Sequence, residues 1–544
     1  MPLIPISKRA RRQPMRTAFG QTSQLVPIPA PIGGLNFKDT IIAMPVVDAV
    51  SLTNVLCRST GVELRAGWRE HVVGLIDANL VTKVSTLMPY IAQHDATQNK
   101  LFAAVGKNIF NVTIAVDTPA ATQITAATDG VWSHTMFSNT AGGVFLCAVN
   151  NGGGYWTYDE SGGWIKRVIT NGTIPNVEQI TSIGAAHDRL WFTFRGSSAV
   201  YYLALGAISG ALNQFDLGPK LVHGGQPIAT TSWTQDGGLN VSDFTVFFGS
   251  QGDVIVYEGY DPASAATWSL VGVWFIGRVP AGDKFFTKVG ADIYFLTERG
   301  VFPLSLLVSG SLAGASFSPI TSKIQNGLIP EVVGQIGERW ELQVLPKIDA
   351  LMIQQPRTVN GANRQWMMSL TTNAWSIFSG IEMTATTLFA GTFYFGQPGG
   401  VVGVGLESGY QTDKQTFNGT AGTVIEGDIQ PAFNPFNTSG QLKTFQMARV
   451  IFIGPMAPSV AVRMNTQFNL EAVPGSPGFV APSGSQWNAS NWNEAFWNGS
   501  SSTFEVWTGI TGVGYYGSLR MAVRGAPGTA WSAAHILYEP GGMM

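Results

Sequence analysis

One short pattern recurs along the middle of this 544-residue chain and limits what it can fold into. Each copy is a run of β-branched or aromatic residues, a turn with glycine or asparagine, and a second such run. Copies begin near residues 101, 145, 190, 246, 293, 351 and 388. Repeats of about 40–50 residues with four short strands each are typical of propeller blades. We therefore expect an all-β fold with a β-propeller of six to eight blades over residues 91–409. Two ordinary β-sandwiches with irregular hairpins are the alternative.

The regions around this repeat have a different composition. Residues 1–35 are basic and rich in proline, which predicts an extended arm. Residues 36–90 are expected to cap the ring or complete its last blade. They contain a short helix candidate at Val46–Asn54 and a strand at Gly61–Val72. From residue 410 the repeat stops and Asn, Ser and Thr become more frequent, so residues 410–544 predict a β-sandwich-like domain.

Charge is scarce in this chain. The 32 Lys and Arg and 34 Asp and Glu residues make up 12% of it, about half the usual share. A net charge of −2 argues against wrapping of nucleic acid, which requires a basic face. The low charge suits a protein that buries much of its surface against partners. Five cations without an acid stand near the start, and they predict an arm that docks on a neighbouring subunit or on nucleic acid, unless it is a disordered tail: Lys8, Arg9, Arg11, Arg12 and Arg16.

Motifs for catalysis, metal binding and cofactor binding are missing from the sequence. The six histidines have no metal-ligand spacing, and neither a nucleophile elbow nor a phosphate loop occurs. Cys57 and Cys147 allow one disulfide at most, which is no disulfide framework. We therefore expect no catalytic, cofactor-binding or metal-binding residues, and not an enzyme. Two uncharged stretches, 196–215 and 301–322, contain several Gly and Ser, so we interpret them as strand and loop rather than as membrane spans.

Two local clusters leave a sugar-binding role open. Five carboxylates fall within about 25 residues, and two of them could flank a glycosidic bond, although turn capping by Asp is the commoner use. These are Asp236, Asp243, Asp253, Glu258 and Asp261. Three Trp-Asn pairs begin at Trp487, Trp492 and Trp497. Their spacing of five fits neither one helix face nor one strand face. These tryptophans are candidates for a subunit interface or for contact with a glycan.

Several longer stretches carry a family resemblance. The opening has Pro31-Ile32-Gly33-Gly34-Leu35-Asn36, Met44-Pro45, Asp48-Ala49, Asn54 and the run from Gly61 to Trp68. The middle has Asp188 to Phe192, Leu205 to Gly210, Phe215 to Gly218, Trp233 to Gly238, Ser250 to Val254, Tyr257 to Gly259, Asp261-Pro262 and Trp268 to Gly272. The end has Tyr538 to Met544. Together these stretches resemble tail proteins of short-tailed phages, in the class called tail nozzle, tail tubular protein B or packaged-DNA stabilisation protein.

The resemblance implies a β-propeller with added β domains, assembled as a homohexameric ring below the tail adaptor. It implies a structural virion protein, made in the host cytoplasm, that extends and closes the DNA-ejection channel. The implied partners are other copies of the chain, the adaptor, tail fibres or spikes, and double-stranded DNA in passage. No catalytic residue carries over from the family. A receptor-binding or glycan-degrading propeller on the phage surface is the alternative function.

Overall fold

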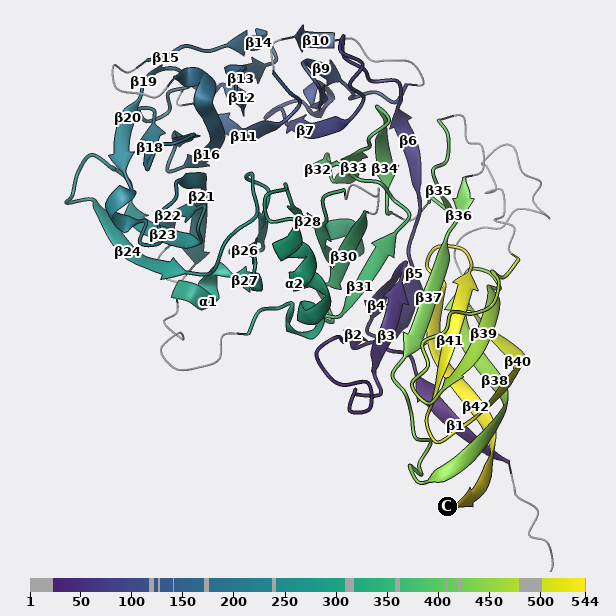
Figure 1. Ribbon diagram of the computed structural model, residues 1–544. Helices are drawn as coiled ribbons and strands as arrows, with labels where there is room; N and C mark the ends of the chain where they lie inside the picture. Colours follow the sequence, from purple (N-terminus) through teal and green to yellow (C-terminus); the bar gives the residue numbers. More distant parts are fainter. Residues whose placement is uncertain are drawn as a thin grey trace, which may run out of the picture.

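Six separate small sheets and part of a nine-stranded sheet stand around a common axis as seven blades of a ring, and a β-sandwich that shares the nine-stranded sheet lies beside it (Figure 1). The computed structural model describes residues 23–116, 122–125, 128–139, 141–170, 176–236, 241–308, 318–357, 363–407, 409–417, 422–478 and 501–543. The first strand of each blade faces the centre and contacts the first strands of the neighbouring blades, except that β21 of blade 4 contacts β26 of blade 5. The expected all-β propeller is confirmed, with seven blades.

The first four blades are regular four-stranded antiparallel sheets. They consist of β7 (Val84–Tyr90), β8 (Lys100–Val105), β9 (Asn108–Asn111) and β10 (Thr122–Thr125); β11 (Trp132–Ser138), β12 (Val144–Asn150), β13 (Gly154–Asp159) and β14 (Gly163–Lys166); β16 (Ile180–Ala186), β17 (Arg189–Phe194), β18 (Ala199–Tyr202) and β20 (Asn213–Asp216); and β21 (Pro227–Asp236), β22 (Val241–Gly249), β23 (Asp253–Gly259) and β24 (Trp268–Phe275). A two-stranded parallel ribbon, β15 (Ile169–Thr170) with β19 (Gly210–Ala211), connects blades 2 and 3.

The last three blades depart from this regularity. Blade 5 has β25 (Phe286–Val289), β26 (Asp292–Thr297) and β27 (Gly300–Pro303), and blade 6 has β28 (Glu341–Leu345), β29 (Ala350–Gln354), β30 (Arg364–Ser369) and β31 (Trp375–Ser379). Helices α1 (Leu304–Val308) and α2 (Gln325–Gly334) lie between them in the chain. Blade 7 has β32 (Ala385–Phe389), β33 (Thr392–Gly396) and β34 (Val402–Gly405). Its outer strand is β6 (Trp68–Val72) from the start of the chain, so the ring closes where β6 pairs with β34.

The predicted repeat maps onto equivalent strands. Six of its first runs fall on the second strand of a blade: β8, β12, β17, β22, β26 and β29. The last run, near residue 388, falls on β32, the first strand of blade 7. Second strands are covered on both faces by neighbouring blades and are almost fully buried, for example at Phe102, Phe192 and Phe247. Burial on both faces explains why these strands are continuous apolar runs.

The sandwich is built from both ends of the chain. One sheet contains β4 (Val55–Arg58), β5 (Gly61–Leu64), β42 (Ala530–Met543), β38 (Gln441–Gly454) and β40 (Ser502–Gly514) in that order, with β1 (Gln24–Pro29) also paired to β42. The other contains β3 (Asp48–Thr53), β37 (Glu426–Pro431), β41 (Gly517–Arg524) and β39 (Ser459–Thr466), and β2 (Gly34–Leu35) pairs with β3. The ring is thus inserted between β5 and β37, and the segment 36–90 divides between sandwich and ring.

The helix expected at Val46–Asn54 is wrong, because these residues form β3 between β31 and β37. Pairing on both sides satisfies its backbone groups, and this tertiary effect outweighs local propensity. The strand expected at Gly61–Val72 is two strands, β5 in the sandwich and β6 in the ring. The break falls at Gly67, where a Cβ would lie 2.0 Å from the Thr412 carbonyl oxygen. Cys57 and Cys147 are both free and buried, in β4 and β12, so they form no bridge with each other.

Candidate functional site

The residues singled out in the two ends of the chain lie outside the described residues. These are the arm cations Lys8, Arg9, Arg11, Arg12 and Arg16 and the tryptophans Trp487, Trp492 and Trp497. The structure does show where the two segments attach. The arm leads into β1, and the tryptophan segment leads into β40, so both adjoin the same sheet of the sandwich.

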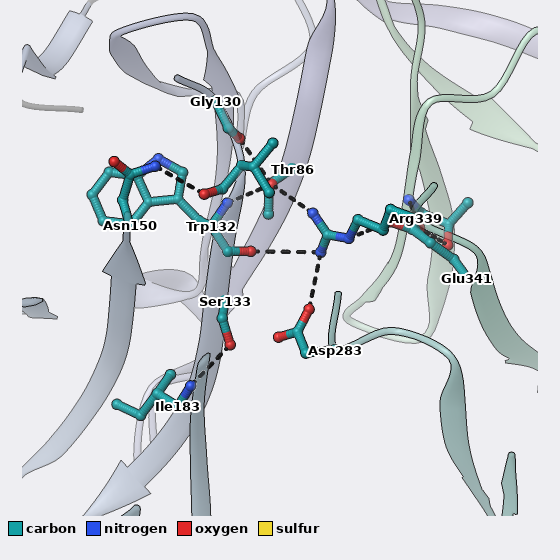
Figure 2. A network of polar contacts seen from close by, with 11 residues as sticks. Thr86, Gly130, Trp132, Ser133, Asn150, Ile183, Asp283, Arg339 and Glu341 are labelled. Carbon is teal, nitrogen blue, oxygen red and sulfur yellow. Dashed lines mark hydrogen bonds and ion pairs between the residues drawn. The ribbon is translucent and has the colours of Figure 1, made fainter. Parts of the chain in front are cut away.

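Arg339 lies at the centre of the ring and bridges blades on opposite sides of it (Figure 2). Its Nη1 donates to Thr86 Oγ1 at 3.3 Å in blade 1, and its Nη2 donates to the Trp132 carbonyl at 3.5 Å in blade 2. The guanidinium also pairs at 3.5 Å with Asp283, just before blade 5, and at 3.5 Å with Glu341 in blade 6. One side chain therefore ties four blades together across the axis.

The neighbours of Arg339 extend this network around the ring. Thr86 Oγ1 accepts from the backbone N–H of Trp132 at 3.0 Å and donates to the Gly130 carbonyl at 2.9 Å. Glu341 accepts from the backbone N–H of Thr386 in blade 7 at 2.7 Å. Ser133 accepts from the N–H of Ile183 in blade 3 at 3.1 Å. The inner strands are thus held by polar contacts as well as by packing (Figure 2).

Two more ionisable groups share the ring centre with Arg339. Burial holds the pKa of His134 well below its usual 6.5, and the nearby cations Lys284 and Arg339 lower it further. Burial also lowers the pKa of Lys284, against the opposing effect of Asp283. These groups keep some accessible surface towards the axis but are surrounded by protein, so charging them is costly. His134 is therefore neutral at pH 7.

The centre of the propeller ring is filled by protein side chains. A single guanidinium bridges the inner strands, so a DNA duplex cannot pass through the propeller ring.

A hollow of about 590 Å³ opens between blades 3 and 4. Its lining includes His187, Asp188, Arg189, Asp243, Tyr260 and Asp261, and we call it the carboxylate hollow. His187 and Asp188 form the β16–β17 turn at φ values of 49° and 52°, a left-handed conformation that Asp and His tolerate better than most residues. Arg189 pairs with Asp261 at 3.4 Å, whereas Asp188 and Asp243 are exposed.

The structure therefore brings two of the five predicted carboxylates, Asp243 and Asp261, to one hollow. Asp253 is buried elsewhere and accepts from His223 Nδ1 at 2.7 Å and from the His223 backbone N–H at 2.9 Å. Its contacts are those of a turn-capping residue. Glu258 is exposed on β23, and the side chain of Asp236 is outside the described part of the chain. Within the described residues, no three His, Cys, Asp or Glu side chains are placed to hold a metal ion.

A third polar cluster joins the ring to the sandwich. The buried Arg65 makes a bidentate pair with Asp413, at 2.7 and 2.6 Å, and donates to the Ser379 carbonyl in blade 6 at 3.0 Å. Its Nε donates to Asn54 Oδ1 at 2.9 Å, which also accepts from the Ser379 N–H at 2.9 Å. Asn54 Nδ2 donates to the Glu426 carbonyl in the sandwich at 3.0 Å. Asn54 and Arg65 belong to the opening stretch that carries the family resemblance.

Sequence reasoning missed both arginines as structural centres. Arg339 stands alone in a polar loop, and nothing nearby in the sequence marks it. Arg65 has a weak signal in the sequence, because it directly follows strand β5 and precedes Gly67 and Trp68. Its partners, Ser379 and Asp413, are more than 300 residues away, so the sequence alone could not identify them.

Comparisons with known proteins do not place this chain in a family. No family model and no curated protein matches the chain. Among solved structures, "Crystal structure of BBS1N in complex with ARL6DN, soaked with mercury" matches with 11% identity and a TM-score of 0.38, covering 63% of this chain and 97% of that chain. "Crystal structure of Nidogen/Laminin Complex" matches with 11% identity and a TM-score of 0.29, covering 52% and 93%. None of the described helices has the length and apolar character needed to cross a membrane.

Proposed function

We propose that this chain is a structural subunit of a phage tail, and that several copies form a nozzle-type ring around the DNA-ejection channel. The proposal is supported by the opening residues, which resemble those of the tail nozzle class. In the structure these residues make the joint between ring and sandwich. Asp48, Asn54 and Arg65 all take part there: the buried Asp48 accepts from Asn36 at 2.8 Å and pairs with Lys323 at 2.8 Å.

The architecture suits such a subunit in two respects. The buried joint holds the sandwich at one orientation to the ring, as an assembly of repeated copies requires. The filled propeller axis leaves the space between copies as the path for DNA. The proposed role needs no catalytic residue, and the proposed partners are the tail adaptor, tail fibres or spikes, and DNA in passage.

Electron microscopy of the purified protein tests the proposal. We expect closed rings with a central opening, six copies in each, and the same density in the tail of intact virions. Labelled antibody against the sandwich should mark the tail tip. Particles that stay single at all concentrations, together with absence of the chain from purified virions by mass spectrometry, would contradict it.

A second function, glycan binding at the phage surface, is favoured by the carboxylate hollow with its exposed Tyr260. Under this proposal Asp243→Asn and Tyr260→Ala should abolish retention on host polysaccharide. Val168→Ala, at a similarly exposed site in the connection between blades 2 and 3, should not. Depolymerisation of the polysaccharide would further identify a glycosidase. Unchanged host adsorption by both hollow variants would count against this function.

A further inference from the structure

The sandwich sheet that contains β1, β42, β38 and β40 has two apolar faces. Its inner face belongs to the core, with Phe445, Val450 and Ile536 almost fully buried. An antiparallel sheet usually turns polar residues to its other face. The outer face instead presents Leu25, Met447, Ile451, Ile453, Trp507, Val513 and Leu537, which we call the apolar face.

The strand register places these residues side by side. Leu25 on β1 lies opposite Leu537 on β42, which lies opposite Met447 on β38. The next row across the sheet is Pro27, His535, Arg449 and Trp507. Trp507 is 49% exposed and Val513 is 53% exposed, so large apolar side chains face outward from four adjacent strands. Contiguous apolar surface of this kind marks an interaction site.

Four titratable residues lie on this face: Arg449, Glu505, His535 and Glu539. The Arg449 guanidinium pairs with Glu505 and lies 5.7 Å from the ring centroid of Trp507. The sheet ends at β40 among the described strands, which leaves a 13-residue edge whose one charged residue is Glu505. A largely apolar sheet face without excess positive charge, and with an open edge, fits an apolar protein surface rather than nucleic acid or an acidic peptide.

A matching apolar surface lies on blade 4, on the far side of the ring from the sandwich (Figure 1). The outer strand β24 has no charged residue, and it exposes Leu270, Val271 and Phe275 at 39%, 38% and 48%. It is the last strand in its sheet. The carboxylate hollow adjoins it, because Tyr260 and Asp261 directly precede the loop to β24.

The distribution of charge along the chain indicates which partner would bind the apolar face. The arm carries five cations and no acid, and it leaves the sandwich at β1, beside the apolar face. The rest of the chain has 27 cationic and 34 acidic residues, a net charge of −7. Three of those acids line the hollow beside β24: Asp188 and Asp243 are exposed, and Asp261 pairs with Arg189. One chain therefore carries two apolar surfaces, the apolar face and β24. It also carries two groups of opposite charge, the basic arm and the carboxylate hollow.

We infer that the apolar face of one copy docks on β24 of a second copy, and that the basic arm of the first enters the carboxylate hollow of the second. The two surfaces differ and lie at opposite ends of the molecule, so the contact is head to tail, and such contacts generate rings or filaments. The inference deepens the proposed function by naming its assembly surface, and it rests on that function only for closure into a ring.

Mixing two assembly-deficient variants tests the inference, with mass measured by light scattering after size-exclusion chromatography. Trp507→Glu damages the apolar face, and Leu270→Glu damages β24. Each variant alone should be monomeric, with association weakened about 30-fold or more, as for removal of a central Trp contact. Mixed together, they should form a heterodimer and nothing larger, because only one intact contact can form. Ile114→Glu, at a 75% exposed site in blade 1, should assemble like the wild type.

The arm contributes separately. Removing residues 1–22 should weaken association and abolish its dependence on salt, which screens ionic contacts. Val513→Glu should reproduce Trp507→Glu, and circular dichroism should show that each variant is folded.

Wild-type-like assembly of the folded single variants, or failure of the mixture to form a heterodimer, would overturn the surface assignment and leave the tail function intact. Variants that behave as expected, with a wild type that forms only open filaments, would support the surfaces and contradict the ring.

Discussion

The ring and the sandwich distribute polar and apolar groups in opposite ways. The ring has charged groups at its centre, where Arg339, Asp283, Glu341 and Lys284 meet, and the sandwich has large apolar side chains on its outer face. Arg339, Asp283 and Glu341 in the ring centre find partners in the same chain. The apolar face of the sandwich has no such cover among the described residues. The polar side chains in the ring centre therefore stabilise the fold of one copy. The exposed apolar side chains of the sandwich indicate contact with other copies.

The strongest test of this division is at the joint, where ring and sandwich meet. Arg65→Met leaves Asp413 buried without its bidentate partner, so we expect a loss of about 3–5 kcal/mol in unfolding free energy. Chemical denaturation followed by tryptophan fluorescence measures this loss. If the joint couples ring and sandwich, the two regions of the Arg65→Met variant should unfold in separate transitions. The control is Arg463→Met, whose partly exposed pair with Glu471 lies within the sandwich and should contribute about 1 kcal/mol or less. Equal losses for both variants would contradict a special role for the joint.

The ring centre is the next test. Arg339→Met leaves Asp283 and Glu341 without their shared cation and should destabilise the protein by about 2–4 kcal/mol, because both carboxylates are largely buried. The matched substitution on the outside of the sandwich, Arg449→Met, should change stability by about 1 kcal/mol or less. Calorimetry of both variants compares them directly. A larger loss for Arg449→Met would reverse the comparison.

Acid should affect the ring through His134. Its folded pKa lies below the 6.5 of an unfolded chain, so between these two values the unfolded state binds the extra proton. The stabilisation is complete above about pH 6.5 and falls by up to about 1.4 kcal/mol for each pH unit below it. Denaturation between pH 7 and pH 5 measures this slope. His134→Asn should make this slope shallower by the contribution of one bound proton, up to about 1.4 kcal/mol for each pH unit. An unchanged slope would show that His134 does not cause the pH dependence.

The smallest expected effect is on the two thiols, one in each region. Burial raises the pKa of Cys57 in the sandwich and of Cys147 in the ring to about 12. At pH 8 neither should react measurably with iodoacetamide in the folded protein, because the thiolate is scarce and inaccessible. In partial denaturant, mass spectrometry of labelled peptides should show which region opens first. Rapid labelling of either thiol without denaturant would mean that its region opens readily.

The parts of the fold that could be predicted are those with local causes. Each blade folds from consecutive residues, so its buried second strand appears in the sequence as an apolar run before a Gly or Asn turn, as at Leu101–Val105. The sandwich could not be predicted in the same way, because β1 and β3 pair with strands near the other end of the chain. The helix expected at Val46–Asn54 was wrong because the strands that pair with β3, β31 and β37, are far away in the sequence. Of the candidate site, Asp243 and Asp261 were identified from their clustering, but Arg65 and Arg339 depend on partners far away in sequence.

The sequence by itself determined the class of this protein: a chain with little charge, a repeat of 40–50 residues and no catalytic motif forms an all-β propeller. Only the tertiary structure decided which surfaces remain exposed after the strands have paired. Closure of the ring by β6 and insertion of the ring into the sandwich depend on long-range strand pairing, which leaves no local pattern. That pairing places Arg339 across the axis and turns Leu25, Met447 and Trp507 to the same outer face. Short-range patterns record what each strand buries, whereas the order in which strands pair decides what remains exposed.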